Sequence, residues 1–344
     1  MPANLSPEYR AAEEAYRKAR DPDERLIHLR EMLRTIPKHK GTEHLQADIK
    51  TRIKQATEDS AGPRKGGARG GPAITVRPEG AAQIALLGPP NSGKSTLHKA
   101  LTGSQAEVGP YPFTTRIPMP GMLLHEDVQF QLIDLPPVSA SFMEPWTPNS
   151  LQPADAALLI VDLTDPECIE HVTAIAERLA AKRISLVDDF EPVEVAATEE
   201  ALEDEDYDPF AIRLPTLLVV SKCELLEAPE RELEVLRELS GATYPSLVVS
   251  ADKGIGTDGI SARLFELLGV VRVYSKVPGK PADLSRPFTV RRGDTVQDVA
   301  RLVHRGLAGD LKTARLWGDG AQFDGQQVSR EHPLADRDVL ELSF

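Results

Sequence analysis

Apolar and polar residues follow three different patterns along the chain, and each pattern predicts a different kind of structure. Residues 7–36 and 42–55 place apolar side chains at helical spacing, for example Leu45, Ile49 and Ile53, which predicts an N-terminal helical segment. From residue 82 onward, short apolar runs alternate with amphipathic stretches. The runs predict strands at 82–87, 122–124, 129–133, 156–162, 216–220 and 245–249, and the amphipathic stretches predict helices near 94–102, 167–182, 228–239 and 257–267.

Strands that alternate with helices are typical of a three-layer α/β domain with a mostly parallel sheet. Residues 271–344 follow a third pattern, in which a strand, a hairpin, an amphipathic helix and returning strands predict a small α+β domain. A Gly-rich stretch with basic residues precedes the α/β part. We therefore expect a helical segment over 1–60, a linker over 61–78, an α/β domain over 79–270 and an α+β domain over 271–344.

Charge is distributed unevenly along the chain. The net charge is −13, from 40 basic and 53 acidic side chains, which argues against a surface that is basic throughout. Residues 1–70 are nevertheless basic on balance, and acidic residues concentrate in an insertion at about 188–210. The insertion is typical of a solvated, disordered segment, and a partner-binding role is the alternative. The clusters Lys38–Lys40 and Arg64–Arg69 fit either solvated turns or contacts with RNA.

Composition points to a cytoplasmic protein. No apolar stretch approaches the ~20 residues of a membrane span, and the first residues lack the basic and apolar regions of a secretory signal. Cys168 and Cys223 are the two cysteines, and their separation fits no metal-binding motif. We therefore expect a protein of the reducing cytoplasm, without a membrane segment.

The strongest chemical signal is a glycine-rich loop directly after the first apolar run. It has the pattern GxxxxGK[ST], with the residues Gly88, Pro89, Pro90, Asn91, Ser92, Gly93, Lys94 and Ser95, followed by Thr96. Glycine lets the backbone curl around a polyphosphate with its N–H groups pointing inward, and the next helix adds positive charge at its N-terminus. Lys94 can reach the β- and γ-phosphates, and the Ser95 hydroxyl can ligate Mg²⁺. The loop therefore predicts a nucleoside triphosphate site.

Further polar residues follow the later apolar runs, at the sheet edge where ligands of such domains bind. The run 129–133 ends at Asp134, whose carboxylate can hold a metal ion through water. The loop Tyr111–Thr115 can bring a threonine hydroxyl to the same metal. The last two runs are followed by Ser221-Lys222-Cys223-Glu224 and by Ser250-Ala251. Because the carboxyl ends of parallel strands share one edge, we expect these groups near the phosphate loop.

The order of these segments resembles the Obg/DRG branch of the Ras-like P-loop GTPases. The sequence Tyr-Pro-Phe-Thr-Thr at 111–115 is distinctive of that branch, and Ile36–Glu43 is similar to the N-terminal helices of its DRG-like members. Residues 271–344 resemble a TGS domain, which has a β-grasp fold. The resemblance covers most of the chain apart from the acidic insertion. It implies binding of GTP and GDP with Mg²⁺, slow GTP hydrolysis, and contact with the ribosome or rRNA through the N-terminal basic segment and the TGS-like domain.

The resemblance also implies roles for single residues. Lys94 would neutralise the β- and γ-phosphates, Ser95 and Thr115 would ligate Mg²⁺, and Asp134 would hold the metal through water. Residues 221–224 would contact the base of the nucleotide, and we call them the base loop. The aliphatic stem of Lys222 would pack along the base. Ser221 belongs to this loop and Ser250 to a second one, Glu224 would accept from the guanine N1–H and 2-amino groups, and the Ala251 N–H would donate to O6.

Two departures from the family pattern bear on function. The family has Asp-x-x-Gly where this chain has Asp134-Leu135-Pro136-Pro137, and Pro137 lacks the N–H that the glycine donates to the γ-phosphate. One such bond is worth about 1.5–3 kcal/mol, so we expect weak discrimination between GTP and GDP. Val138 replaces a water-orienting glutamine, so another group must orient the attacking water.

The second departure lies in the base loop, where Ser221 and Glu224 replace the common asparagine or threonine and aspartate. Glutamate keeps the carboxylate but is longer by one methylene, so we expect guanine preference with a loop that adjusts to it. Two functions of different classes remain open at this point. The first is a slow GTPase, and the alternative is a nucleotide-binding scaffold that no longer switches and acts as an interaction module.

Overall fold

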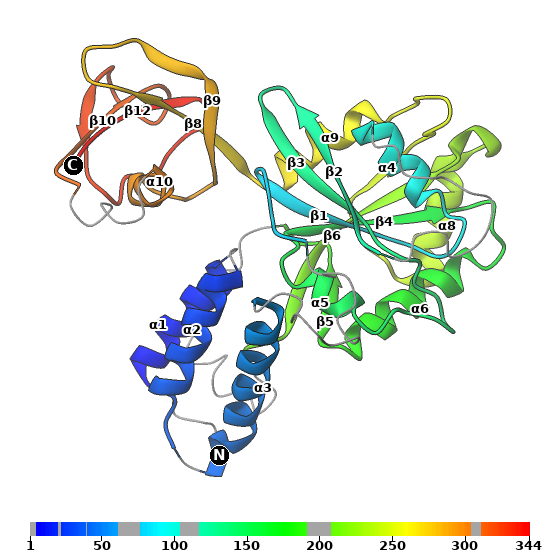
Figure 1. Cartoon of the computed structure of the whole chain (residues 1–344). Helices are drawn as coiled ribbons and strands as arrows, with labels where there is room; N and C mark the ends of the chain where they lie inside the picture. Colours follow the sequence, from blue (N-terminus) through cyan, green and yellow to red (C-terminus); the bar gives the residue numbers. More distant parts are fainter. Residues whose placement is uncertain are drawn as a thin grey trace, which may run out of the picture.

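The computed structural model describes residues 5–19, 22–38, 40–60, 76–103, 117–190, 208–303 and 311–344. Within these ranges the chain forms an N-terminal group of helices, a central α/β domain and a C-terminal β-rich domain (Figure 1). Among the described residues, no helix combines the length and apolarity needed to cross a lipid bilayer. Residues 61–75, which make up most of the expected linker, the loop Tyr111–Thr115 and most of the acidic insertion lie outside the described residues.

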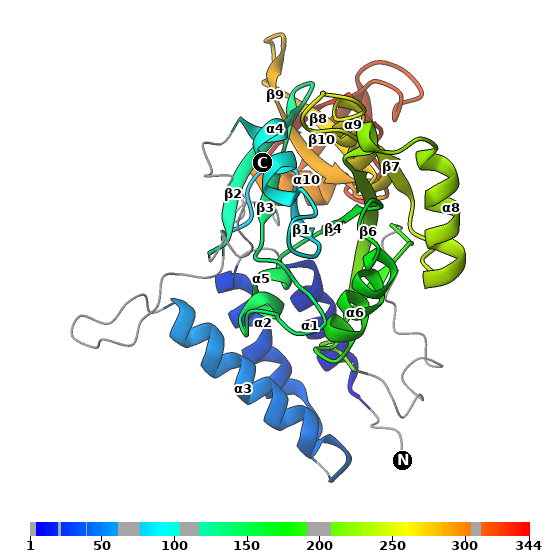
Figure 2. The same cartoon turned by 90° about the vertical axis from the view of Figure 1, so that its right-hand side faces the viewer.

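The N-terminal helices are α1 (Pro7–Lys18), α2 (Pro22–Thr35), the short 3-10 helix η1 (Lys40–Thr42) and α3 (Glu43–Ser60). Helix α1 begins where the sequence provides a cap, because the Ser6 side chain accepts the N–H of Tyr9 at 3.1 Å and Pro7 suits the first turn. Tyr9, Met32 and Ile49 come from the three α-helices and are fully buried together. Figure 2 shows from a second side that these helices extend away from the central sheet.

The central sheet has the strand order β2-β3-β1-β4-β6-β5, and β7 also pairs with β6. All of its pairings are parallel except that of β2 with β3. Strand β5 was not expected from the sequence, and β6 is longer than the expected strand at 216–220. The strands are β1 (Ala82–Leu87), β2 (Met119–His125), β3 (Val128–Asp134), β4 (Ala156–Asp162), β5 (Ile184–Val187), β6 (Ile212–Ser221) and β7 (Ser246–Val248).

Helices cover both faces of this sheet, which explains why its central strands are apolar on both sides. On one face, Ile84 and Leu86 of β1 pack in a cluster with side chains of α4 and α9. On the other face, Ala85 and Leu87 pack in a cluster with side chains of α5, α6 and α8. The predicted three-layer α/β architecture is confirmed. The helices are α4 (Lys94–Thr102), α5 (Thr147–Leu151), α6 (Cys168–Ala180), the 3-10 helix η2 (Cys223–Leu225), α8 (Pro229–Ser240) and α9 (Asp258–Leu267).

The C-terminal domain is a five-stranded sheet in the order β11-β10-β12-β8-β9, with the helix α10 packed on its core. Its central strands β8 and β12 are parallel, and the outer pairings are antiparallel. This arrangement confirms the predicted α+β domain. Its elements are β8 (Val270–Lys276), β9 (Ala282–Arg291), α10 (Val296–Val303), β10 (Thr313–Trp317), β11 (Gln326–Val328) and β12 (Asp338–Ser343).

Strand register brings the carboxyl ends of four strands of the central sheet to one edge. Leu86 of β1 pairs with Asp134 of β3, and Leu87 pairs with Leu159 of β4. On the far side of β4, Asp162 pairs with Ser221 of β6. The loops that follow β1, β3, β4 and β6 therefore start beside one another, as expected for the ligand-binding edge of such a sheet.

Candidate functional site

The glycine-rich loop lies between β1 and α4, and its two glycines are required by geometry. A Cβ atom on Gly88 would lie 2.4 Å from the carbonyl oxygen of Ile160, which is closer than atoms can approach. Only glycine therefore fits at this position after β1. Gly93 precedes the helix with φ at +87°, in the left-handed region that glycine adopts without strain. The backbone therefore turns tightly and points the N-terminus of α4 at the space that the loop encloses.

Lys94 places a cation inside this loop. Its side chain is 6% exposed, and its Nζ donates to the carbonyl oxygens of Gly88 at 3.0 Å and Pro89 at 2.7 Å. Burial lowers the pKa of Lys94 to about 8, and the negative charge of Asp134 opposes this effect. The ammonium group is thus held among oxygen acceptors at the place where the sequence predicts phosphate binding.

Ser95 and Asp134 meet at the next position along the same edge. The Ser95 Oγ donates to Oδ2 of Asp134 at 2.6 Å, and Asp134 is fully buried at the end of β3. A hydroxyl and a carboxylate are the oxygen donors that Mg²⁺ prefers, so this pair fits a metal held directly by Ser95 and through water by Asp134. Thr115, the second metal ligand that the resemblance implies, lies outside the described residues.

The segment after Asp134 is buried, with its apolar side chains in the core and its backbone against the phosphate loop. Leu135 and Val138 are fully buried in the apolar cluster that also contains Leu87. The N–H of Val138 donates to the carbonyl oxygen of Gly88 at 3.1 Å. Because Pro136 and Pro137 have no N–H, Val138 is the first residue after Leu135 that can donate a backbone hydrogen bond. That bond goes to the phosphate loop.

The base loop is held to the phosphate loop by two side chains. The Ser221 Oγ donates to the carbonyl oxygens of Ser92 at 2.7 Å and Val161 at 3.1 Å. The Lys222 Nζ donates to the carbonyl oxygen of Asn91 at 2.8 Å, and Lys222 itself adopts a left-handed conformation with φ at +54°. Ser221 therefore bonds the phosphate loop through its hydroxyl, and the larger side chain of the common asparagine is not needed for this contact.

Asp162 is a member of this site that we did not predict from the sequence. Its Oδ2 accepts from Lys222 at 2.6 Å, and its Oδ1 accepts from the N–H and hydroxyl of Thr164 at 2.9 Å and 2.6 Å. Burial raises the pKa of Asp162, but the hydrogen bonds from Lys222 and Thr164 outweigh burial and hold the pKa below its ordinary value. The available signal was its position, since it ends the apolar run 156–162 as Asp134 ends the run 129–133.

A small pocket opens between the base loop and the start of α4. It is lined by Glu224 and Ala251 together with Gly93, Thr96, Leu97, Ser221, Lys222, Val249 and Asp252. The Oε2 atom of Glu224 is buried and has no hydrogen-bond partner among the described residues. Ser250 lies behind the pocket, where its backbone pairs with Ile255 and its hydroxyl accepts the N–H of Lys253. The structure thus brings Lys94, Ser95, Asp134, Ser221, Lys222, Glu224 and Ala251 to one edge of the sheet, together with Asp162.

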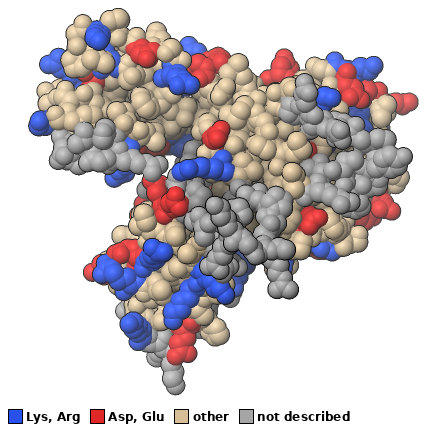
Figure 3. Space-filling view, viewed as in Figure 1, with Lys and Arg blue, Asp and Glu red and all other residues tan. Residues whose placement is uncertain are grey.

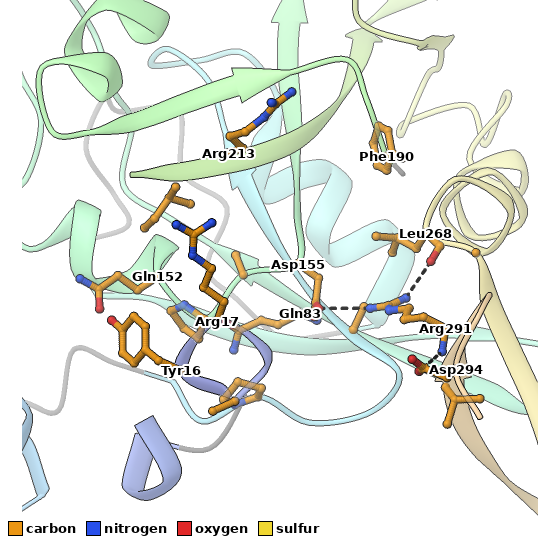
Figure 4. A pocket seen from close by; sticks show the side chains of 18 of the residues that line it. Tyr16, Arg17, Gln83, Gln152, Asp155, Phe190, Arg213, Leu268, Arg291 and Asp294 are labelled. Atoms are coloured by element: carbon orange, nitrogen blue, oxygen red, sulfur yellow. Dashed lines mark hydrogen bonds and ion pairs between the residues drawn. The ribbon is translucent and has the colours of Figure 1, made fainter. Parts of the chain in front are cut away.

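A larger cleft of about 2500 Å³ lies at the opposite edge of the sheet, between the N-terminal helices and the C-terminal domain. At its centre, Asp155 accepts from Arg291 at 3.1 Å and from the backbone N–H of Gln83 at 2.8 Å (Figure 4). The space-filling view shows that basic and acidic side chains both lie around this hollow (Figure 3). This mixture of charges does not favour binding of a polyanion, and no sequence pattern predicted the cleft.

Comparisons with known proteins show which families this chain resembles. Residues 83–191 match the family described as 50S ribosome-binding GTPase, and residues 271–343 match the TGS domain. The uncharacterized GTP-binding protein MJ1326 of Methanocaldococcus jannaschii is 28% identical, covering 93% of this chain and 92% of its own length. Developmentally-regulated G-protein 2 of Arabidopsis thaliana is 27% identical over 91% of this chain and 88% of its own. Developmentally-regulated GTP-binding protein 2 of Bos taurus is 23% identical, and the match covers 93% of this chain and 98% of the length of the bovine protein. These matches confirm the resemblance of the chain to the Obg/DRG type of P-loop GTPases that carry a C-terminal TGS domain.

Proposed function

We propose that this protein binds GTP and GDP with Mg²⁺ and slowly hydrolyses GTP to GDP and phosphate. The observation that carries the proposal is the meeting of three groups at one sheet edge. A buried ammonium lies inside a phosphate loop, a hydroxyl–carboxylate pair fits Mg²⁺, and a buried carboxylate oxygen in a small pocket has no partner in the described part of the chain. Each group matches one part of a Mg²⁺–guanine nucleotide.

Each part of the nucleotide has a partner in this proposal. The Lys94 ammonium moves from the carbonyl oxygens of Gly88 and Pro89 to the β- and γ-phosphate oxygens, and the N–H groups of the loop bind the phosphates. Glu224 accepts from N1–H and the 2-amino group of guanine, and the Ala251 N–H donates to O6. The metal, when bound, neutralises charge that develops on the phosphate oxygens. Ser95, Thr115 and Asp134 are the residues that we assign to it.

Hydrolysis is slow in this proposal because the site lacks two groups that accelerate it. Val138 is buried in the core, so its side chain does not face an attacking water. Pro137 offers no N–H to the γ-phosphate, and the N–H of Val138 bonds to Gly88. The segment 134–138 is therefore coupled weakly to the γ-phosphate, and a partner or a bound cation must arrange the attack for fast turnover.

The same observation favours a second candidate function, a nucleotide-binding scaffold with little or no hydrolysis. In that case the Pro136–Val138 segment would hold one conformation whatever nucleotide is bound. The variant Pro137→Gly distinguishes the two functions, because it restores an N–H donor. Acceleration of phosphate release by this variant supports a slow GTPase with intact remaining machinery. A rate that stays at zero in both proteins supports the scaffold.

Binding itself is tested by displacement of labelled GTP from the full chain with Mg²⁺ present. Excess unlabelled GTP or GDP should displace the label, and excess ATP should not, because adenine lacks the two donors that Glu224 accepts. Equal displacement by ATP and GTP would overturn the guanine assignment. Phosphate release measured on the same samples reports turnover.

We propose the ribosome, through its rRNA, as the partner. The match of residues 83–191 to a family described as ribosome-binding, the basic clusters before the α/β domain and the TGS domain support this choice. Co-sedimentation of the full chain with 50S subunits and with 70S ribosomes tests the proposal. Binding that weakens as salt rises is expected, and no co-sedimentation at low salt would contradict it.

A further inference from the structure

The C-terminal domain contacts the α/β domain at one end of the β2–β3 hairpin. Arg272, on β8, is 5% exposed and donates to Asp127 at 3.1 Å and to Glu126, both in the turn that joins β2 to β3. The hydroxyl of Tyr274 donates to Asp127 at 2.6 Å, and Arg337 donates to Glu126 at 3.0 Å. We call these five residues the Arg272 cluster.

The geometry of Arg272 is fixed from its own domain as well. Its Nε and Nη2 donate to the two carboxylate oxygens of Asp336 at 3.0 Å and 2.6 Å, a bidentate pair that sets the plane of the guanidinium. The hydrogen bonds that Arg272 donates to Asp336, Glu126 and Asp127 raise its pKa, so the cation stays charged at any physiological pH. Its guanidinium lies 4.9 Å from the ring centroid of Phe265 on α9.

The turn of the hairpin is also packed on α9. The ring of His125 lies 5.0 Å from that of Phe265, and its Nδ1 is 3.2 Å from the hydroxyl of Ser261. Phe265 is therefore in contact with the hairpin through His125 and with the C-terminal domain through Arg272. The turn therefore cannot shift relative to α9 or to the C-terminal domain without changing these contacts.

The other end of the same hairpin is part of the nucleotide site. Strands β2 and β3 pair without interruption from His125↔Val128 at the turn to Met119↔Asp134 at the site. A paired ribbon of seven residues is about 20 Å long, so this hairpin reaches from the Arg272 cluster to the nucleotide site. Asp134 accepts the Ser95 hydroxyl, so a metal ion bound by Ser95 changes the hydrogen bonding at the end of β3.

We infer that the TGS domain responds to the loading of the nucleotide site with Mg²⁺ and nucleotide through the β2–β3 hairpin and the Arg272 cluster. This inference rests on the proposed function. It concerns loading and not the choice between GTP and GDP, because the connection runs through Asp134 and not through the segment that carries Pro137. By thermodynamic linkage, a cluster that responds to loading must also change the affinity for the loaded nucleotide.

The test compares two variants that each remove one arginine from the interface between the same two domains. Arg272→Ala breaks the contact with the hairpin. Arg291→Ala is the matched control, because Arg291 lies on β9 and donates to Asp155 and to the carbonyl oxygens of Ala81 and Leu268, away from the hairpin. We measure the Kd for GDP by titration calorimetry on the full chain, with Mg²⁺ and with EDTA.

Arg272→Ala should weaken GDP binding by about fivefold or more with Mg²⁺, while Arg291→Ala stays within about twofold of the wild type. With EDTA, the three proteins should bind alike, because the connection to Asp134 runs through the metal. Equal affinities with Mg²⁺, or equal losses in both variants, would overturn the inference. If the wild type binds no guanine nucleotide, the proposed function fails, which is a different outcome.

Two milder variants keep the test valid if Arg272→Ala folds poorly. Tyr274→Phe removes one hydroxyl and Asp127→Asn removes one charge, and both should weaken GDP binding in the same direction by less than Arg272→Ala does. Hydrogen exchange on the wild type gives a second measurement. Addition of Mg²⁺ and GDP should slow exchange in residues 122–128 and 270–276, and unchanged exchange in both stretches would contradict the inference.

Discussion

The two halves of the nucleotide site depart from the family pattern in opposite ways. In the base half, Ser221 and Glu224 replace the common residues, but each keeps a group of the required chemical type. The Ser221 hydroxyl bonds the phosphate loop, and a Glu224 carboxylate oxygen is buried with no partner among the residues that the structure describes. In the γ-phosphate half, Pro137 removes the required N–H altogether, and the N–H of Val138 bonds to Gly88.

This contrast shows that the effect of a replacement depends on whether the hydrogen-bonding group is kept. The similarity of the two residue types matters less. A longer carboxylate can still accept two hydrogen bonds if the loop moves by a small distance. A missing donor cannot be regained by any such adjustment. The base half should therefore still select guanine, whereas the γ-phosphate half should distinguish GTP poorly from GDP.

The largest expected effect comes from Lys94, which both halves require because it neutralises the phosphates. Lys94→Met should weaken GTP binding by about 100-fold, since a charge-assisted bond is worth up to about 3 kcal/mol. The fold should not suffer, because burial already opposes the charge at this position. Titration calorimetry and thermal unfolding measure the two effects, and a loss of binding that merely follows a loss of folding would contradict this account.

The base half is tested by Glu224→Gln, which replaces an acceptor by an amide that also donates. GTP binding should weaken by about 30-fold, because the guanine donors lose one acceptor. Xanthosine triphosphate should gain relative to GTP, since its O2 can accept from the new amide. Glu224→Asp is the matched control that keeps the carboxylate, and it should retain guanine preference. Loss of guanine preference in both variants would show that the length of the side chain, and not its charge, selects the base.

The γ-phosphate half is tested by Pro137→Gly. The restored N–H should raise the preference for GTPγS over GDP by about tenfold, which corresponds to one charge-assisted bond. Pro136→Gly adds an N–H one position earlier and is the control for general loosening of the segment. Equal changes of the preference in the two variants, or no change in either, would contradict the role assigned to Pro137.

The pH dependence of binding follows from the pKa of Lys94. Its value of about 8 in the free protein means that the ammonium loses its proton as the pH rises above 8. Phosphates favour the charged form, so GTP affinity should be about fourfold lower at pH 8.5 than at pH 7. Lys94→Arg, which stays charged, should show no such fall. A wild-type affinity that is flat over this range would contradict the assigned pKa.

The lowered pKa of Lys94 also determines how its contribution to the free energy of unfolding changes with pH. The pKa of Lys94 is lower in the folded chain than its ordinary value of 10.5, so the unfolded chain keeps the proton to higher pH. The contribution of Lys94 to the free energy of unfolding therefore rises as the pH rises from about 8 toward 10.5.

The smallest effect is expected at Asp162, which holds Lys222 but does not itself face the nucleotide pocket. Asp162→Asn keeps an oxygen for Thr164 and removes the charge that Lys222 contacts at 2.6 Å. GTP affinity should fall by about threefold, consistent with a partly exposed ion pair of at most about 1 kcal/mol. Calorimetric titrations of the variant and the wild type measure this change. A loss as large as that of Glu224→Gln would place Asp162 in direct contact with the base instead.

The sequence alone predicted the features that are defined by residues close together in the chain. The phosphate loop needs a short glycine pattern between a strand and a helix, and Asp134 and Lys222 follow apolar runs that could be identified as strands. The fold class followed from the alternation of strands and helices. These features depend on neighbours in the chain, so their patterns remain visible without the structure.

The features that sequence did not reveal depend on contacts between distant residues. The burial of Val138 and its bond to Gly88 arise from packing between two loops, and the Arg272 cluster joins residues that are more than a hundred positions apart. The short strand β5 is four residues long, too short for a clear apolar pattern. Asp162 is an intermediate case, because its position at a strand end was visible but its partner Lys222 was not.

The most direct test of the contrast between the two halves is the ratio of the Kd values of the wild-type full chain for GTPγS and GDP, with Mg²⁺ present. We predict that both nucleotides bind and that their Kd values agree within about threefold, well under the 1.4 kcal/mol that a tenfold difference requires. A preference of about tenfold or more for GTPγS would mean that the γ-phosphate is sensed despite Pro137, and would contradict the account.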